Sequence, residues 1–342
     1  MDATTPPLYR RFPGLERTLP RVRLARTPAT PARRMRALEA ALGPAAPRGG
    51  LWLKDDGAFA APYGGNKPRK LEFVLAEARA RGRHAILTLG GTGTNHGLAT
   101  AIYARQLGLH PILLLVDQPD TRQARTQLER LRASGATLCF THGPIRTLLA
   151  LPFLLLRHAA YFLWIGGSSP LGTVGFVEAG LELGEQIARG ELPEPSHLVC
   201  ALSSGGTAAG LLVGLRLAGL RTRVHAIAVA EQRYVSARMV ARLARRTVRL
   251  LRRRGADVPA GARDYAATDL DVEHGFVGSA YGALLPAAED AVALCAAAES
   301  LRLDSVYTGK AMAALVAHAR TGGFGDGPVL FWHTYDAGEG AE

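Results

Sequence analysis

Short apolar runs alternate with longer stretches of helical periodicity along almost the whole chain. The apolar runs predict strands and the stretches between them predict helices. The stretch 68–83 is one such helix, because its apolar residues share one face and Pro68 suits the first turn. This alternation is typical of βαβ units, so we predict an α/β fold with mostly parallel strands. The predicted strands are 51–54, 85–89, 111–116, 137–141, 162–165, 197–202, 224–229 and 329–333.

The composition indicates a folded protein with a buried core. Of its 342 residues, 48% are hydrophobic and 20% are charged, which suits one large domain or two modest ones and excludes disorder as the main state. The longest apolar stretch, 148–156, contains Pro152 and is well short of the ~20 residues that a membrane-spanning helix needs. Residues 1–20 lack the basic start and apolar middle of a secretory signal. We therefore expect a cytoplasmic protein that does not act on membranes.

The cysteines point to no disulfide framework and no metal site. They are an odd number, widely spaced, and each lies in an apolar stretch. These residues are Cys139, Cys200 and Cys295.

The net charge of +12 raises the alternative of a nucleic-acid-binding module, and the arginines between 238 and 254 are its best local support. These arginines alternate with valine and leucine at helical spacing, and no aromatic residue lies among them. The solvated face of an amphipathic helix is therefore the favoured interpretation, and nucleic acid is not an expected partner.

Glycine-rich turns follow several of the predicted strands. In parallel sheets the ligand lies at the carboxyl ends of the strands, so these turns are where chemistry is expected. They are 63–67, 90–96, 166–172, 203–210 and the less regular 278–282.

The turn 203–210 has the character of a phosphate cup. An apolar strand leads into two serines, two glycines and a threonine, and a helical pattern follows. Glycines let the backbone approach an anion, and the backbone N–H groups at the helix start point at it. No Lys-Ser or Lys-Thr pair follows, so this is not a P-loop, and the turn at Gly91 also fails the dinucleotide pattern because His96 stands at the third glycine position.

Lysine is scarce in this chain, which makes Lys67 informative. Only four of the 41 basic residues are lysines, and Lys67 stands between a glycine pair and a predicted helix. An amine that must act as a nucleophile cannot be replaced by guanidinium, which keeps its proton. The pKa of such an amine falls when it is desolvated or lies near another cation, and Arg69 and Lys70 are close in sequence.

A phosphate cup together with a nucleophilic lysine describes pyridoxal phosphate, whose aldehyde reacts with an amine and whose ring accepts electrons. On these residues the sequence resembles the 1-aminocyclopropane-1-carboxylate deaminase and D-cysteine desulfhydrase family, which has the tryptophan-synthase β-like fold. The resemblance covers 51–334. The segments that carry it, in the order of the family, are 64–72, 94–96, 167–172, 204–207 and 306–312.

The resemblance implies roles for these residues. Lys67 would form the Schiff base with the cofactor and move the proton on the substrate Cα. Thr94, Asn95 and His96 would bind the substrate carboxylate, and Asn95 would also bond to the 3-hydroxyl of the cofactor. The remaining implied residues are the phosphate loop Ser204, Gly205, Gly206 and Thr207, the active-site tyrosines Tyr281 and Tyr307, and Thr308 beside the pyridine nitrogen. Thr94 is counted with Lys67 and the tyrosines among the catalytic residues.

The resemblance also implies an architecture of two open, mostly parallel twisted sheets with flanking helices, which is the fold of type II pyridoxal-phosphate enzymes. The larger, cofactor-binding domain would combine residues 1–70 with 181–342. The smaller domain would be the inserted section 71–180. Members of the family are usually homodimers, so a homodimer is expected here.

Thr308 favours one reaction of the family over the other. A carboxylate at this position would hold a proton on the pyridine nitrogen, which suits the opening of a cyclopropane ring, whereas a hydroxyl offers only a hydrogen bond. We therefore expect a lyase that removes sulfide from D-cysteine by β-elimination, giving pyruvate and ammonia. The open alternatives are a deaminase, a racemase or another enzyme on a small amino acid, and a pyridoxal-phosphate-binding protein without turnover.

Several residues depart from the family pattern. Thr94 stands for a serine, Ser203 for a glycine, and Tyr335 with Asp336 for a glycine pair. The stretch 148–164 is also more apolar than the family would suggest, which indicates a buried or subunit-facing surface. His96 and Tyr281 keep the alternative of purely structural roles.

Overall fold

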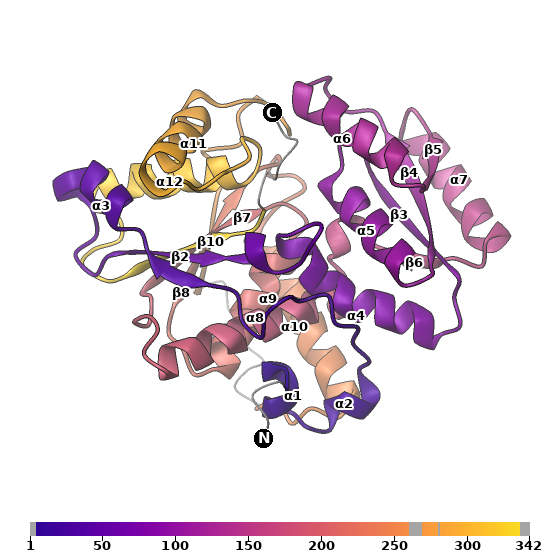
Figure 1. The fold of residues 1–342 in the computed structure, drawn as a ribbon, viewed down its shortest axis with the longest axis horizontal. Coiled ribbons are helices and arrows are strands. Elements are labelled where there is room, and N and C mark those ends of the chain that lie inside the picture. The colour runs from indigo at the N-terminus through magenta and orange to yellow at the C-terminus, as the bar shows by residue number, and fades with distance from the viewer. Residues whose placement is uncertain (1–4, 260–268, 280, 336–342) are drawn as a thin grey trace.

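The computed structural model describes residues 5–259, 269–279 and 281–335, and its helices and strands surround two separate sheets. Figure 1 shows them as two lobes, with the larger sheet among α8 to α12 and the smaller among α5 to α7. Two mostly parallel sheets with flanking helices confirm the predicted fold class.

The larger sheet has six strands in the order β1-β2-β10-β7-β8-β9. All neighbours in it are parallel except β1 and β2. Its strands are β1 (Ala32–Arg34), β2 (Leu51–Asp55), β7 (His197–Leu202), β8 (Arg223–Ala228), β9 (Leu270–Glu273) and β10 (Val329–His333).

The smaller sheet has four parallel strands in the order β5-β4-β3-β6. They are β3 (Ala85–Gly91), β4 (His110–Val116), β5 (Thr137–Phe140) and β6 (Tyr161–Leu163). All four lie inside the predicted inserted section, while its boundaries at residues 71 and 180 stay a prediction.

Helices cover both faces of each sheet or join the lobes. They are α1 (Pro7–Arg11), α2 (Leu15–Thr18), α3 (Arg36–Leu42), α4 (Asn66–Ala80), α5 (Asn95–Gln106), α6 (Arg122–Ala133), α7 (Pro144–Arg157), α8 (Pro170–Ala188), α9 (Gly206–Leu217), α10 (Ala237–Arg253), α11 (Pro286–Glu299) and α12 (Thr308–Arg320). Three short 3₁₀ helices are η1 (Gly43–Ala45), η2 (Asp56–Ala58) and η3 (Ile165–Gly167).

Strand β10 shows how the larger sheet forms a core on both faces. Side chains alternate between faces along a strand. Leu330 and Trp332 join the core cluster under α8 and α9, whereas Val329 and Phe331 join the cluster under α12. All four are fully buried.

Helices α8 and α9 cross at very short range because both carry glycine at the contact. A Cβ atom added to Gly180 of α8 would lie 2.8 Å from the Cα atom of Gly214 in α9. Helix α9 begins at the predicted phosphate cup, so this packing fixes the position of the cup.

The eight predicted strands are all present, with ends that differ by at most two residues. Strands β1 and β9 were not predicted. Helix α4 begins at Asn66, so Lys67 lies inside its first turn and not before it. The predicted arginine-rich helix corresponds to α10, which buries its valine and leucine face. Among the described residues, no helix is long and apolar enough to cross a membrane.

Candidate active site

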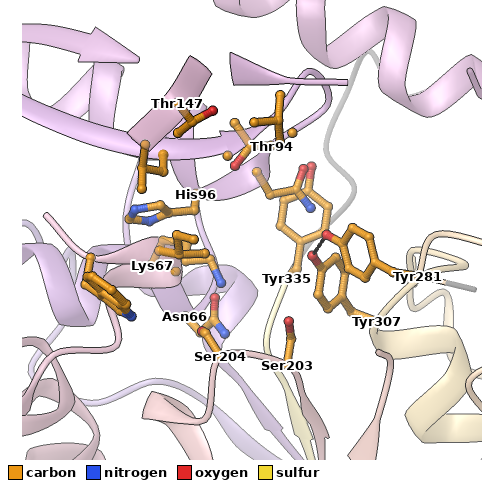
Figure 2. A pocket seen from close by; sticks show the side chains of 18 of the residues that line it. Asn66, Lys67, Thr94, His96, Thr147, Ser203, Ser204, Tyr281, Tyr307 and Tyr335 are labelled. Atoms are coloured by element: carbon orange, nitrogen blue, oxygen red, sulfur yellow. Dashed lines mark hydrogen bonds between the residues drawn. The ribbon is translucent and has the colours of Figure 1, made fainter. Parts of the chain in front are cut away.

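A cavity of about 510 Å³ lies where the strands of both sheets end. Gly90 and Gly91 close β3, Ser203 and Ser204 follow β7, and Thr334 follows β10. The carboxyl edge of parallel strands is the expected place for a ligand. Figure 2 shows the side chains that line this cavity.

Lys67 reaches the cavity from the first turn of α4 (Figure 2). Burial lowers the pKa of its amine to about 8, against the opposing charge of Asp304. The turn before it requires glycine, because Gly65 has a φ of 89° and its Cβ would lie 2.6 Å from the carbonyl oxygen of Thr334. The Asn66 N–H donates to that same oxygen at 2.7 Å, which ties the start of α4 to the end of β10.

The predicted phosphate loop adjoins the cavity at the start of α9. Ser204, Gly205, Gly206 and Thr207 line a smaller hollow that also includes Lys67. Gly205 has a φ of 86°, which lets the chain turn from β7 into the helix. The backbone N–H groups of this turn and the positive end of α9 are suited to an anion.

Ser168 and Lys70, to which the sequence analysis gave no role, hold the phosphate loop in place through hydrogen bonds. The Ser168 Oγ accepts the N–H of Gly206 at 3.1 Å and lies 2.7 Å from the Oγ of Ser204. The Lys70 Nζ donates to Ser168 Oγ and to the carbonyl of Gly166, both at 3.1 Å.

Lys70 is 2% exposed, and burial together with Lys67 lowers its pKa well below the ordinary value. A Cβ added to Gly206 would lie 2.9 Å from its Nζ, so the amine lies directly beneath the loop. The scarcity of lysine and the three-residue spacing from Lys67 on one helix were the signals that could have identified it.

The turn 94–96 forms the start of α5 at the cavity. The Thr94 Oγ1 accepts the N–H of Gly97 at 3.1 Å, so it caps the helix. The His96 Nε2 lies 2.9 Å from the Oγ1 of Thr88, and its Nδ1 has no partner among the described residues. Burial and the amines of Lys67 and Lys70 lower the pKa of His96 well below its usual value, so its ring is neutral.

Asn95 is held by a side-chain relay that the sequence analysis did not predict. The Gln127 Nε2 donates to the Oδ1 of Asn95 at 2.8 Å and to the hydroxyl of Tyr335 at 3.1 Å. Tyr335 also lines the cavity, and it steadies Asn95 through Gln127. Asp336 lies outside the described residues.

Tyr281 and Tyr307 face Lys67 across the cavity, and their hydroxyls are hydrogen-bonded to each other (Figure 2). Burial raises the pKa of both phenols, most strongly at Tyr307. Both hydroxyls are therefore protonated at neutral pH, and because one proton lies in the bond between them, the other can be donated to a group in the cavity.

Thr308 is the one predicted site residue that lines neither hollow. It is 1% exposed, its Oγ1 donates to the Asp304 carboxylate at 2.8 Å, and it accepts the N–H of Asp304 at the same distance. The carboxylate also accepts the N–H groups of Val306, Tyr307 and Thr308. Asp304, which was not predicted, therefore fixes the start of α12 and the position of Tyr307.

Comparison with known proteins identifies the family to which the chain belongs. The chain matches the family of pyridoxal-phosphate-dependent enzymes over residues 25–334, and it belongs to that family. It is an enzyme with pyridoxal phosphate as its cofactor.

The chain is similar to several individual proteins of known name or structure. The chain is 35% identical to the D-cysteine desulfhydrase of Salmonella choleraesuis over 296 residues, which are 83% of this chain and 86% of the relative. It is similar to the crystal structure of an ACC (1-aminocyclopropane-1-carboxylate) deaminase homologue, with 26% identity, a TM-score of 0.79 and coverage of 97% and 95%. Maize serine racemase, at 16% identity with a TM-score of 0.62 and coverage of 90% and 87%, shares the fold.

The residues present fit this cofactor. A Cβ at Gly206 would lie 2.5 Å from the Ser168 Oγ and 2.9 Å from the Lys70 Nζ, so only glycine lets the loop approach these two groups this closely. Beneath that loop lies the buried amine of Lys70, and the second amine, that of Lys67, is accessible from the same hollow. One end thus suits a phosphate and the other an aldehyde.

Proposed function

We propose that the protein is a lyase that removes sulfide from a small D-amino acid, with D-cysteine going to pyruvate, hydrogen sulfide and ammonia with the uptake of one water. The observation that carries the proposal is that Lys67, with its pKa lowered to about 8, lines one cavity with the Tyr281–Tyr307 pair and an adjoining hollow with the glycine loop. The similarity to D-cysteine desulfhydrase supports the choice of substrate.

The residues divide the work by position. Ser204, Gly205, Gly206 and Thr207 bind the phosphate, with Lys70 beneath them. The bound cofactor supplies a ring that accepts the electron pair left when Cα loses its proton. The resemblance assigns Thr308 to the pyridine nitrogen as a neutral partner, and its single hydroxyl proton, which is donated to Asp304 here, would have to turn toward the ring for that bond to form.

Substrate binding falls to the turn 94–96. Its N–H groups at the start of α5 and the side chains of Thr94 and Asn95 bind the substrate carboxylate, where the positive end of the helix favours an anion. The neutral ring of His96 adds no charge, so it orients the carboxylate through a hydrogen bond only.

Proton transfer falls to Lys67 and the tyrosines. The Lys67 amine, with a pKa near neutrality, can accept the Cα proton and release it again. The Tyr281 and Tyr307 hydroxyls keep their protons, so one of them can donate to the departing sulfur while the other holds it in place.

The test is release of sulfide and pyruvate from D-cysteine by the purified holoenzyme, beside Lys67→Ala, with the absorbance of bound cofactor recorded for both. Release by the wild type alone supports the proposal. Faster opening of 1-aminocyclopropane-1-carboxylate than sulfide release would make the protein a deaminase, as the similarity to the ACC deaminase homologue allows. Cofactor absorbance without product from any amino acid would leave a binding protein.

A further inference from the structure

One wall of the cavity is apolar. Helix α7 contributes one part of it, and the segment that follows β6 contributes the other. Leu89 at the end of β3 and Val116 at the end of β4 complete the surface. We call it the apolar wall, and its four defining residues are Leu148, Leu151, Trp164 and Ile165.

The wall leaves large apolar surfaces in contact with solvent. Leu148 is 72% exposed, Trp164 54% and Ile165 46%, although all three face a cavity. Apolar area in this position gains free energy when a ligand covers it, by about 25 cal/mol for each Å² removed from water. A ligand that only filled the space between Lys67 and the tyrosines would not reach this gain.

Apart from the indole N–H of Trp164, the wall offers a substrate side chain no free polar group among its described residues. Thr147 is the polar member of α7 that lines the cavity, and Figure 2 shows it beside Thr94. Its Oγ1 is already bonded to the carbonyl of Gly143 at 2.8 Å and to the Oγ1 of Thr141 at 2.6 Å. A polar substituent placed against Leu148, Leu151 or Ile165 would lose its bonds to water without replacement.

The sequence analysis did not predict that this apolar stretch lines a cavity. The apolar stretch 148–164 was interpreted as a buried or subunit-facing surface. In the structure Leu151 packs partly on the smaller sheet, while Leu148 projects to the cavity mouth and Leu149 to the outside of the helix.

We propose that the apolar wall binds an alkyl or aromatic group on the sulfur of the substrate, so that the preferred substrates are S-substituted D-cysteines. This inference rests on the proposed function and specifies its substrate class. The reaction breaks the Cα–H and Cβ–S bonds, the sulfur leaves as a thiol with one proton, and the three-carbon remainder takes up water to give pyruvate and ammonia.

The first test measures binding without turnover. D-norleucine and D-alanine carry no leaving group, and they differ by three methylenes. We expect the holoenzyme to bind D-norleucine about 10- to 60-fold more tightly by calorimetry, since each buried methylene contributes about fourfold. Equal affinity for the two ligands would overturn the inference.

Two variants on one helix locate the effect. Leu148→Asp removes a residue of the wall, whereas Leu149→Asp changes its neighbour, which is 70% exposed and does not line the cavity. Because both side chains are largely exposed, neither substitution threatens the fold. We expect Leu148→Asp to abolish most of the preference for D-norleucine and Leu149→Asp to preserve it, and equal loss in both variants would contradict the role of the wall.

The second test measures turnover. We expect kcat/KM for S-propyl-D-cysteine, followed by thiol and pyruvate release, to exceed that for D-cysteine by about tenfold or more, mainly through a lower KM. Elimination from D-cysteine with no advantage for the propyl compound would overturn this inference and leave the proposed function intact. Tight, Leu148-dependent binding of D-norleucine without elimination from either compound would overturn the proposed function and, with it, the substrate class, and would leave only the binding role of the apolar wall.

Discussion

The burial of two lysines determines the charge in the candidate active site. Lys67 and Lys70 lie three residues apart on α4, and neither forms an ion pair with a described residue. Burial lowers the pKa of both amines, and the charge of Lys67 lowers the pKa of Lys70 further. A pocket that receives an aldehyde and a phosphate needs this arrangement, with one amine free to react and another ready to take up a proton.

The first prediction concerns the pH dependence of cofactor uptake. Only the neutral amine of Lys67 reacts with an aldehyde, and its pKa is about 8. The rate at which cofactor-depleted protein gains the absorbance of bound cofactor should rise about tenfold per pH unit below pH 8 and level off above it. A rate that keeps rising to pH 10 would indicate an unshifted lysine, and Lys67→Ala provides the baseline.

The second prediction separates Lys70 from Lys67. In Lys70→Met the phosphate loses a charge-assisted hydrogen bond of about 1.5–3 kcal/mol, so the Kd for pyridoxal phosphate should rise roughly 10- to 100-fold. Binding of pyridoxal, which lacks the phosphate, should be unchanged. If both cofactors lose affinity equally, Lys70 supports the fold of the loop and does not bind the phosphate.

At the scale of the element, the local sequence pattern was enough to predict the strands that have a continuous apolar side. Seven of the eight predicted strands supply buried residues to a core, and β5 supplies the half-buried Leu138 and Cys139. Strand β1 was missed because its residues are Ala32, Arg33 and Arg34, an edge strand with little buried surface. Strand β9 was missed because Asp271 and Glu273 interrupt its apolar residues, and Asp271 pairs with Arg223 on the neighbouring strand.

The candidate site was predictable where a motif is contiguous and unpredictable where partners come from distant segments. The glycine loop and Lys67 were evident because each lies in a short glycine-rich turn. Gln127 lies on α6, in a stretch with no motif, and only the fold brings it to Asn95 and Tyr335. The apolar stretch that includes α7 was noticed, but which of its faces meets the cavity depends on the packing of α7 against the smaller sheet.

The third prediction tests Asp304 as the residue that fixes the start of α12. Asp304→Ala removes the acceptor for the N–H groups of Val306, Tyr307 and Thr308, and it should lower the free energy of unfolding by about 1–2 kcal/mol. Because Tyr307 loses its anchor, kcat should fall as well. Urea titration and pyruvate release measure the two effects.

A capping residue that does not line the cavity is the control for Asp304. Ser236 accepts the N–H of Met239 at the start of α10. Ser236→Ala should lower the free energy of unfolding by about 1 kcal/mol and leave kcat unchanged. If the two variants show the same kcat, the role of Asp304 is confined to stability.

At the scale of the whole molecule, a buried charge network ties together segments that are far apart in sequence. Arg69 of α4 bonds to Asp56 of η2 at 2.8 Å and to Glu182 of α8 at 2.8 Å. Lys54 of β2 also bonds to Glu182, and Thr30 contributes its hydroxyl. All of these side chains are buried, so each charge is stable only while its partners are present.

The fourth prediction follows from that dependence. Arg69→Met leaves Asp56 and Glu182 short of their main partner, and removing one member of a buried pair costs about 3–5 kcal/mol of the free energy of unfolding. The exposed pair Arg125–Asp120 supplies the control. Arg125→Met should change the free energy of unfolding by less than about 1 kcal/mol. Urea titration near pH 7 should separate the two variants clearly.

We expect the difference in unfolding free energy between wild type and Arg69→Met to decrease at acid pH. Burial alone would raise the pKa of Glu182, but Arg69 and Lys54 hold it below its ordinary value of 4.5. A carboxylate with a lowered folded-state pKa stabilises the protein above its unfolded pKa, and the contribution is lost as the pH falls through the folded value. The gap in unfolding free energy between wild type and Arg69→Met should therefore be full near pH 7 and narrow steadily below pH 4.5. A gap that stays constant down to the acid transition would mean that Arg69 acts through packing on Phe59, whose ring centre lies 4.3 Å from the guanidinium carbon, and not through its charge.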